Sequence, residues 1–430
     1  MAAGIVGATL DSVFAEQSAR IVSSIVRATG DWELAEDSLQ DAAARAIAAW
    51  ETDGVPDNPG AWLTTVAKRR AIDQLRRASS ERRAVGALAR ENQSVGTEEQ
   101  AMMIENDPVD DRLSLIFTCA HPALSMDARV ALTLRTVAGL SVTSIARSFM
   151  VSDATMTKRL VRARARIKDA GIPYRVPPPE LLAERASGVL AVLYLLFNEG
   201  YSATGGHGLV DAPLQREATR LARLLIDVAG AAPYREEAVG LLAMMLLHGS
   251  RNRARLGAAG EVIPLEDQDR SLWDHDAIAE AVGLLNEATL ALAASGGSPG
   301  PYYLQASIAV RHAVADSPAD TDFVGIAALY RTLMAVAPSP VVELNLAVAI
   351  AMADGPGVAL ALVERLDDSG VLEGYYLVPA ARADLLRRLG RSSDALPHYA
   401  RAAALAPSGQ ERAYLTARIA AAAAPETFRR

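Results

Sequence analysis

The sequence contains a single cysteine, Cys119, and few aromatic residues. One thiol cannot form an internal disulfide and excludes a cysteine-rich zinc site, as is typical of a protein from a reducing compartment. Aromatic residues make up 5% of the chain, whereas alanine and leucine recur in nearly every block of ten. This composition favours helices over sheets. An all-α fold is therefore expected.

Long apolar runs are also missing. The longest ones, such as residues 188–197, have about half of the roughly 20 residues that a membrane-spanning helix needs. The N-terminal residues lack the basic segment before an apolar stretch that marks a secretory signal. No membrane segment is expected, and the cytoplasm is the expected location.

Recognisable catalytic and metal-binding motifs are absent as well. Cys119 and His121 stand close together, but two candidate ligands fall short of a four-ligand zinc site. The other histidines occur singly, without a nucleophile elbow, a phosphate loop or metal-ligand spacing around them. These are His207, His248, His275, His312 and His398. We expect no catalytic residue, metal or cofactor, and interpret Cys119 as a core thiol.

Charge of both signs is present, but it is unevenly distributed. The formal net charge of −8 by itself argues against a protein that binds the nucleic-acid backbone. Acidic residues concentrate at positions 31–53, whereas basic residues concentrate at positions 68–83 and 158–168. The two basic segments are therefore candidate nucleic-acid contacts in an acidic chain.

Breaks in the helical pattern divide the chain. Helical hydrophobic spacing covers residues 10–83 and returns at 110–170, whereas residues 84–109 are rich in Gly, Asn, Gln and acids, as in a flexible connector. Prolines make residues 171–180 a second linker. Residues 181–430 are helical in pattern throughout. We expect two small helical domains followed by a large helical one.

The second basic segment lies in a pattern typical of a DNA-binding helix-turn-helix. Ser141 and Ser152 stand where the two helices need N-caps. Leu160 and Ile167 point to one side of the second helix, and a basic stripe follows helical spacing on another. The stripe consists of Thr155, Arg159, Arg162 and Arg166. The alternative is a basic helix that is merely solvated, which the adjoining capped helix disfavours.

The first basic segment lies on a helix expected between residues 60 and 77. Asn58 and Pro59 suit its N-cap and first position. A polar stripe follows helical spacing along it and comprises Arg70, Gln74 and Arg77. This stripe is a candidate DNA contact. The alternative is an exposed helix in which Arg69 pairs with Asp73, worth only a few tenths of a kcal/mol.

The order of three segments resembles that of the extracytoplasmic-function sigma factors. Residues 36–41 resemble the helix with which that family binds core RNA polymerase, and residues 61–77 resemble its helix beside the minus-ten promoter element. Residues 141–168 resemble its helix-turn-helix for the minus-thirty-five element. The likeness covers about residues 10–170. It departs from the family pattern at Met150, where many such turns have glycine.

The resemblance implies a role for each segment. Core RNA polymerase would be bound through Glu36, Asp37, Gln40 and Asp41. Minus-ten promoter DNA would be contacted by Asn58, Arg70, Gln74 and Arg77, with residues 52–58 holding an unstacked base. Minus-thirty-five DNA would be contacted by Ser152, Thr155, Lys158, Arg159, Arg162 and Arg166. The protein would then be a sigma factor that directs core polymerase to promoters.

The C-terminal part carries a repeated spacing. Tyr330 and Tyr399 each stand eight residues before a proline, and they are about two 34-residue periods apart. The second copy has the turn and packing residues of a tetratricopeptide repeat. These are Gly390, Ala395, Tyr399, Ala402 and Pro407. Tetratricopeptide-like repeats are expected at about residues 300–425.

Residues 193–201 and 265–274 resemble the sigma-factor subgroup with a tetratricopeptide-like C-terminal extension. The resemblance implies that residues 181–430 regulate or support activity through a protein or small-molecule partner. Two alternatives stay open: a regulator that binds an operator without polymerase, and an enzyme built on the helical C-terminal half. The acidic helix 31–50 argues against an operator binder, which has no use for it.

Overall fold

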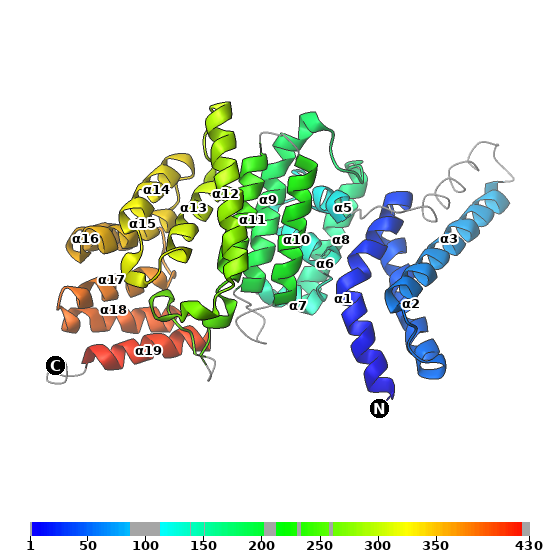
Figure 1. Ribbon diagram of the computed structural model, residues 1–430. Coiled ribbons are helices and arrows are strands. Elements are labelled where there is room, and N and C mark those ends of the chain that lie inside the picture. Colours follow the sequence, from blue (N-terminus) through cyan, green and yellow to red (C-terminus); the bar gives the residue numbers. More distant parts are fainter. Residues whose placement is uncertain are drawn as a thin grey trace. The chain divides into compact units, whose positions relative to one another are not determined.

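Figure 1 shows the computed structural model of the chain, which describes residues 2–86, 112–137, 139–149, 151–201, 212–229, 234–257 and 261–423. Throughout these residues the regular elements are helices, apart from one isolated antiparallel bridge between Leu256 and Val262. The expected all-α fold is confirmed. The chain divides into two compact units, residues 1–228 and 229–430.

Three mutually packed helices open the N-terminal unit: α1 (Ala2–Thr29), α2 (Trp32–Asp53) and α3 (Pro59–Gly86). The chain turns between α1 and α2 because Gly30 has a left-handed backbone (φ 66°). Asp31 then caps α2 by accepting a hydrogen bond from the Leu34 N–H (3.0 Å). The rings of Trp50 and Trp62 meet edge to face at 5.6 Å and join α2 to α3.

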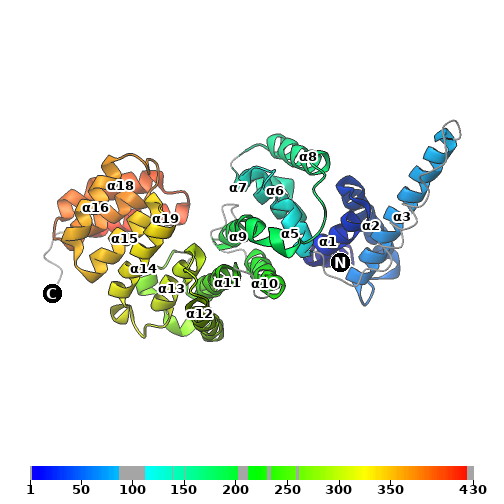
Figure 2. The same cartoon turned by 90° about the horizontal axis from the view of Figure 1, so that it is seen from above.

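Four shorter helices follow in the same unit: α5 (Arg112–Cys119), α6 (Met126–Thr136), α7 (Val142–Ser148) and α8 (Asp153–Asp169). Helix α6 packs against the other three, and α7 lies against α8 (Figure 2). Each helix contributes a completely buried side chain to one core, namely Phe117, Leu132, Ile145 and Met156. This shared core fixes α8 on α6 and α7, so that only one side of α8 is left for other contacts.

The N-terminal unit continues with α9 (Pro179–Tyr201) and α10 (Ala212–Ala229). Helix α9 packs against α5 and α6. A Cβ added at Gly188 would lie 3.2 Å from both the Ala120 carbonyl oxygen and Arg129 Nη1, so the glycine permits this close approach. The compact unit thus extends past residues 171–180, where the proline pattern indicates a boundary.

The C-terminal unit begins with α11 (Arg235–Gly249), α12 (His275–Ser295) and α13 (Pro301–Ala313), with η1 (Asn252–Ala254), η2 (Leu265–Asp267) and η3 (Arg270–Leu272) between α11 and α12. Helix α11 packs against α12 and α13. The Glu237 carboxylate accepts two backbone N–H bonds in the first turn of α13 (3.0 and 3.1 Å). At the other end of α13, Arg270 Nη1 donates to the carbonyl oxygens of His312 and Ala315 (2.8 and 2.7 Å).

The rest of this unit is a succession of helices, each packed on the next: α14 (Phe323–Val336), α15 (Pro340–Ala353), α16 (Pro356–Asp368), α17 (Leu377–Arg388), α18 (Ser392–Leu405) and α19 (Gly409–Ala423), with η4 (Pro318–Asp320) before them. Ala395, Tyr399 and Ala402 of α18 are buried, as packing residues of a helical repeat must be. The assignment to the tetratricopeptide family stays a prediction.

Two glycines of the C-terminal unit should respond oppositely to alanine. Gly390 turns the chain between α17 and α18 with φ 75°, whereas Gly283 lies exposed within α12. In both places an added Cβ meets nothing within 4 Å. We expect Gly390→Ala to lower the free energy of unfolding by about 1 kcal/mol, because an L-residue is strained at positive φ. Gly283→Ala should raise it by about 0.5–1 kcal/mol. Urea unfolding measures both, and equal shifts would contradict the assigned backbone at Gly390.

One helix in the described part of the chain, α12, is long and apolar enough to cross a membrane by length and composition alone. In this structure Ile278, Ala281, Leu285 and Ala288 form its buried side, and the helix packs on α11. A helix that packs in a protein core passes the same test of length and composition. The feature is therefore weak evidence for a membrane span.

Candidate nucleic-acid interface

Helix α8 has one buried side and one strongly basic side. Met156, Leu160, Ala163 and Ile167 are buried against α6 and α7, which confirms the expected inward direction of Leu160 and Ile167. On the remaining surface several polar and cationic side chains are exposed. They are Thr155, Lys158, Arg162 and Arg166. The helix therefore offers a cationic surface to an anionic partner.

Both expected N-caps of the helix-turn-helix are present. Ser141 Oγ accepts a hydrogen bond from the Ser144 N–H (3.0 Å), and Ser152 Oγ accepts one from the Thr155 N–H (3.2 Å). Thr143 Oγ1 of α7 donates to Asp153 Oδ2 of α8 at 2.6 Å. These contacts fix the start of α8 relative to α7, which positions the end that enters a DNA groove in this motif. The backbone at Met150 lies outside the described residues.

Arg159 differs from the other cations of the expected stripe. Its Nη1 lies 3.3 Å from Asp127 Oδ2, and its guanidinium lies 5.2 Å from the centre of the Phe149 ring. Its side chain is only 27% exposed. Arg159 therefore lies at the edge of the exposed side of α8, where it contacts Asp127 and Phe149 of the same module. A contact between Arg159 and DNA would compete with these two partners.

The structure adds an apolar residue that sequence reasoning missed. Val161 is 57% exposed, and it lies between Lys158 and Arg162 in the sequence. Successive helical residues are about 100° apart, so the direction opposite the buried side falls on Lys158 and Ala165, with Val161 next to them. A helical projection from Leu160 and Ile167 gives this direction, whereas a search for cations alone does not. An exposed Val in a major groove suits contact with a thymine methyl group.

Helix α2 carries the acidic residues expected to bind polymerase. Asp37 and Gln40 are exposed. Glu36 instead forms an ion pair with Arg164 of α8, and Asp41 forms one with Arg70 of α3 (both 2.5 Å). The structure thus divides the four residues into two that are exposed and two that are engaged in ion pairs.

The candidate minus-ten residues lie on and before α3. Asn58 is exposed and caps the helix, since its Oδ1 accepts from the Ala61 N–H (3.0 Å). Arg77 is exposed, Gln74 is partly buried, and Arg70 is held by Asp41. Helix α3 continues beyond the expected end at residue 77 to Gly86. The three stripe residues thus share a rigid helix, of which Arg77 is the exposed cation.

The one thiol is enclosed in the core of the α5–α8 module. Cys119 is fully buried, and its Sγ lies 3.4 Å from Thr136 Oγ1. Burial raises the pKa of the thiol to about 12, which leaves almost no reactive thiolate. Within the described residues, His, Cys, Asp and Glu side chains do not converge in threes as a metal site needs.

We expect Cys119 to resist a disulfide exchange reagent in the folded protein near pH 8 and to react completely in urea, because both burial and protonation protect the sulfur. The absorbance of the released thiol measures the reaction. Rapid modification without denaturant would contradict the described core.

Three protein-family models match parts of the chain, which together span residues 14–171 and 185–289. Residues 14–81 match the family model for sigma-70 region 2, and residues 56–171 match the model for ECF sigma factors. Residues 185–289 match DUF6596, a family of unknown function. No solved structure matches the chain.

Two curated relatives are similar to this chain over different lengths. An uncharacterized protein of Rhizobium meliloti is 41% identical over 411 residues, which cover 94% of each chain. The ECF RNA polymerase sigma factor SigL of Mycobacterium tuberculosis is 32% identical over 176 residues, which cover 40% of this chain and 96% of SigL. With the capped basic helix-turn-helix and the acidic α2 in place, the chain belongs to the ECF sigma factor family, and it is a sigma factor that directs RNA polymerase to promoters.

Proposed function

We propose that three surfaces of the N-terminal unit divide this work. Helix α2 binds core polymerase, residues 52–58 and α3 hold the minus-ten element, and α8 reads the minus-thirty-five element. The observation that carries the proposal is the exposed cationic surface of α8 opposite its buried side. These surfaces lie in the two small domains expected from the sequence, residues 10–83 and 110–170.

For α8 the proposal follows from the chemistry of duplex DNA. Lys158, Arg162 and Arg166 are long exposed cations that can reach phosphates or the acceptor atoms of guanine. Ser152 and Thr155 at the N-terminal end add hydroxyl donors close to the backbone. Specificity would come from the outward side, on the order of 1–3 kcal/mol for each good base contact.

For α2 and α3 the proposal distinguishes direct contacts from positioning. Asp37 is exposed and can meet a partner without any rearrangement, whereas Gln40 is exposed but also lines a narrow gap between α2 and α6. Asp41 neutralises Arg70, which fixes the angle between α2 and α3 and keeps this arginine from repelling other cations. Asn58 and Arg77 remain exposed for a single strand, which binds through phosphates and stacked bases.

We further propose that residues 181–430 regulate or support transcription in the cytoplasm through a protein or small-molecule partner. Support comes from α9, which packs directly on α5 and α6, so that a change in the extension can reach the helix-turn-helix module.

Run-off transcription from a genomic promoter library, with purified core polymerase and the full-length protein, tests the function. We expect new transcripts whose start sites share two upstream elements at constant spacing. Binding of duplex DNA without any transcript or core binding would favour an operator-binding regulator instead. A variant with alanine at Asp37 and Gln40 should lose core binding and keep duplex DNA binding, which separates the two surfaces.

A further inference from the structure

An ion pair joins the two DNA-reading modules of the N-terminal unit. Arg164 Nη2 of α8 donates to Glu36 Oε1 of α2 at 2.5 Å. The two side chains are only 21% and 17% exposed, so the pair is largely shielded from water. The charge-assisted hydrogen bond is short, but water solvates both charges again when the modules separate, so opening costs much less than the ion pair alone would suggest.

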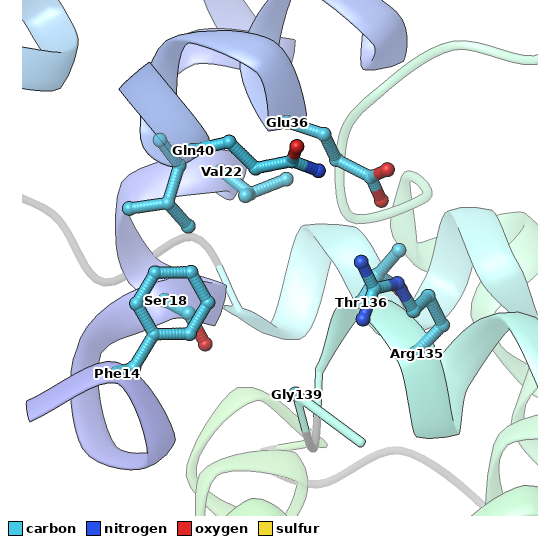
Figure 3. Close-up of a pocket in the computed structure, with 9 residues that line it drawn as sticks. Phe14, Ser18, Val22, Glu36, Gln40, Arg135, Thr136 and Gly139 are labelled. Atoms are coloured by element: carbon cyan, nitrogen blue, oxygen red, sulfur yellow. The ribbon is translucent and has the colours of Figure 1, made fainter. Parts of the chain in front are cut away.

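The contact extends well beyond this pair. Figure 3 shows Phe14 of α1 and Gln40 of α2 on one side of a narrow gap, with Arg135 and Thr136 of α6 on the other. The gap measures about 30 Å³, enough for one or a few waters but not for an organic ligand. It is therefore a seam between two packed surfaces.

A close backbone approach lies at the edge of the same seam. Gly139 has φ 69°, and a Cβ built there would lie 3.0 Å from Ser18 Oγ of α1. Elsewhere along the boundary the rings of Trp32 and Tyr174 meet edge to face at 6.4 Å. Helix α1 also packs against α5 and α6. Apolar, aromatic and ionic contacts thus hold α1 and α2 against the α5–α8 helices and the segment that follows α8.

The seam includes two residues of α2 that are also proposed to bind core polymerase. Glu36 is paired with Arg164, and Gln40 lines the seam. Both belong to the surface with which α2 is proposed to bind core polymerase, so this inference rests on the proposed function. One surface cannot serve both partners at the same time.

We propose that the free protein has a closed state, in which the α5–α8 module covers the Glu36 and Gln40 side of α2 and competes with core polymerase. The competition is intramolecular, so it acts at every protein concentration. The apparent affinity for polymerase is reduced by the fraction of protein that is open. Opening then exposes the polymerase-binding side of α2. It also lets α8 move away from α3, so that the two helices can bind promoter elements that lie apart on the DNA.

Fluorescence energy transfer in the full-length protein can test the closed state. Dyes are attached at Ala44→Cys on α2 and Asp169→Cys at the end of α8, both of which are exposed. Cys119 is buried, so we expect it not to take up dye. Arg164→Glu puts two carboxylates together in the seam, and Ser18→Arg inserts a large cation from the α1 side. Both variants should lower transfer efficiency, and core polymerase should lower it in the unmodified sequence.

A matched control is Lys168→Ala, which removes an exposed cation from the last turn of the same helix. It should leave the transfer efficiency unchanged. We expect Arg164→Glu and Ser18→Arg to bind core about 5- to 30-fold more tightly than the unmodified protein does, because the open fraction rises toward one. Arg164 and Ser18 are not among the residues proposed to touch core polymerase, so the gain is attributable to opening.

The outcomes separate the closed state from the proposed function. Transfer efficiency that is the same in all variants would overturn the closed state, whatever the binding to core. A fall in efficiency with unchanged core affinity would overturn the competition. If no variant binds core, the proposed function and the competition both fail, while the transfer measurement still decides whether the modules separate.

Discussion

Replacing Lys158 and Arg162 together by alanine is expected to reduce transcription from promoters of this protein by roughly 30-fold to 10⁴-fold, at unchanged core affinity. Both side chains are exposed on the surface of α8 that faces away from its core. Each base contact is worth about 1–3 kcal/mol, so two contacts to different base pairs together amount to about 2–6 kcal/mol. Run-off transcription at fixed salt measures the effect, and a titration with labelled core measures the affinity.

Comparison variants sharpen this result. Arg159→Ala should weaken transcription less and lower stability slightly, because this arginine is held by Asp127 and Phe149. Lys168→Ala removes one positive charge from the same helix and should change transcription little. If Arg159→Ala matched the double variant, the outward direction assigned to α8 would be wrong. Equal loss of core binding would mean that the double variant disturbs the fold.

Acidification from about pH 7.5 to about pH 5 is expected to lower the free energy of unfolding of the C-terminal unit by about 3–4 kcal/mol. Burial and the neighbouring Arg251 lower the pKa of His248 to about 3, and burial with Arg251 and Arg270 lowers that of His312 to about 4. Both values lie below the ordinary 6.5, so the unfolded chain binds more protons once the pH falls below it. The contribution of these two histidines to the free energy of unfolding is fully present above about pH 6.5, and it is lost as the pH falls toward their lowered pKa values.

Urea unfolding at several pH values tests this. Trp273 is the tryptophan of the C-terminal unit, so the ¹⁹F signal of fluorotryptophan at this position reports that unit separately. His248→Gln stays neutral at every pH and should remove about half of the dependence. Subtracting the pH dependence of His248→Gln from that of the unmodified protein removes the contributions of other titrating groups. One of these is Glu237, whose pKa is raised by burial. His275→Gln at the exposed start of α12 is the matched control. An unaltered slope in His248→Gln would refute the assignment.

Much of the local structure was readable in the residues themselves. Asn58, Ser141 and Ser152 cap helices as short polar side chains do before a helical run. The burial of Leu160, Ile167 and Cys119 also follows from local pattern. These features depend on neighbours within a few positions of the chain, which is why they could be predicted.

The role of individual charges could not be read in the same way. Arg159 and Arg162 look alike in the sequence, yet one is held by Asp127 on another helix and the other is exposed. Glu36 and Asp37 are adjacent acids, of which only Glu36 meets Arg164, 128 positions away. Helical spacing gives the direction of a side chain on its own helix, but not what another helix places opposite to it.

The all-α fold, the caps, the capped basic helix and the resemblance to ECF sigma factors could be predicted from the residues alone, because each depends on composition or on short-range spacing. Three features became evident only from the packing of the helices: α9 packs on the helix-turn-helix module, Val161 points outward, and α8 contacts α2 through Arg164. These features arise where helices distant in sequence share one buried surface, and the gain from that burial depends on the whole arrangement rather than on any one segment.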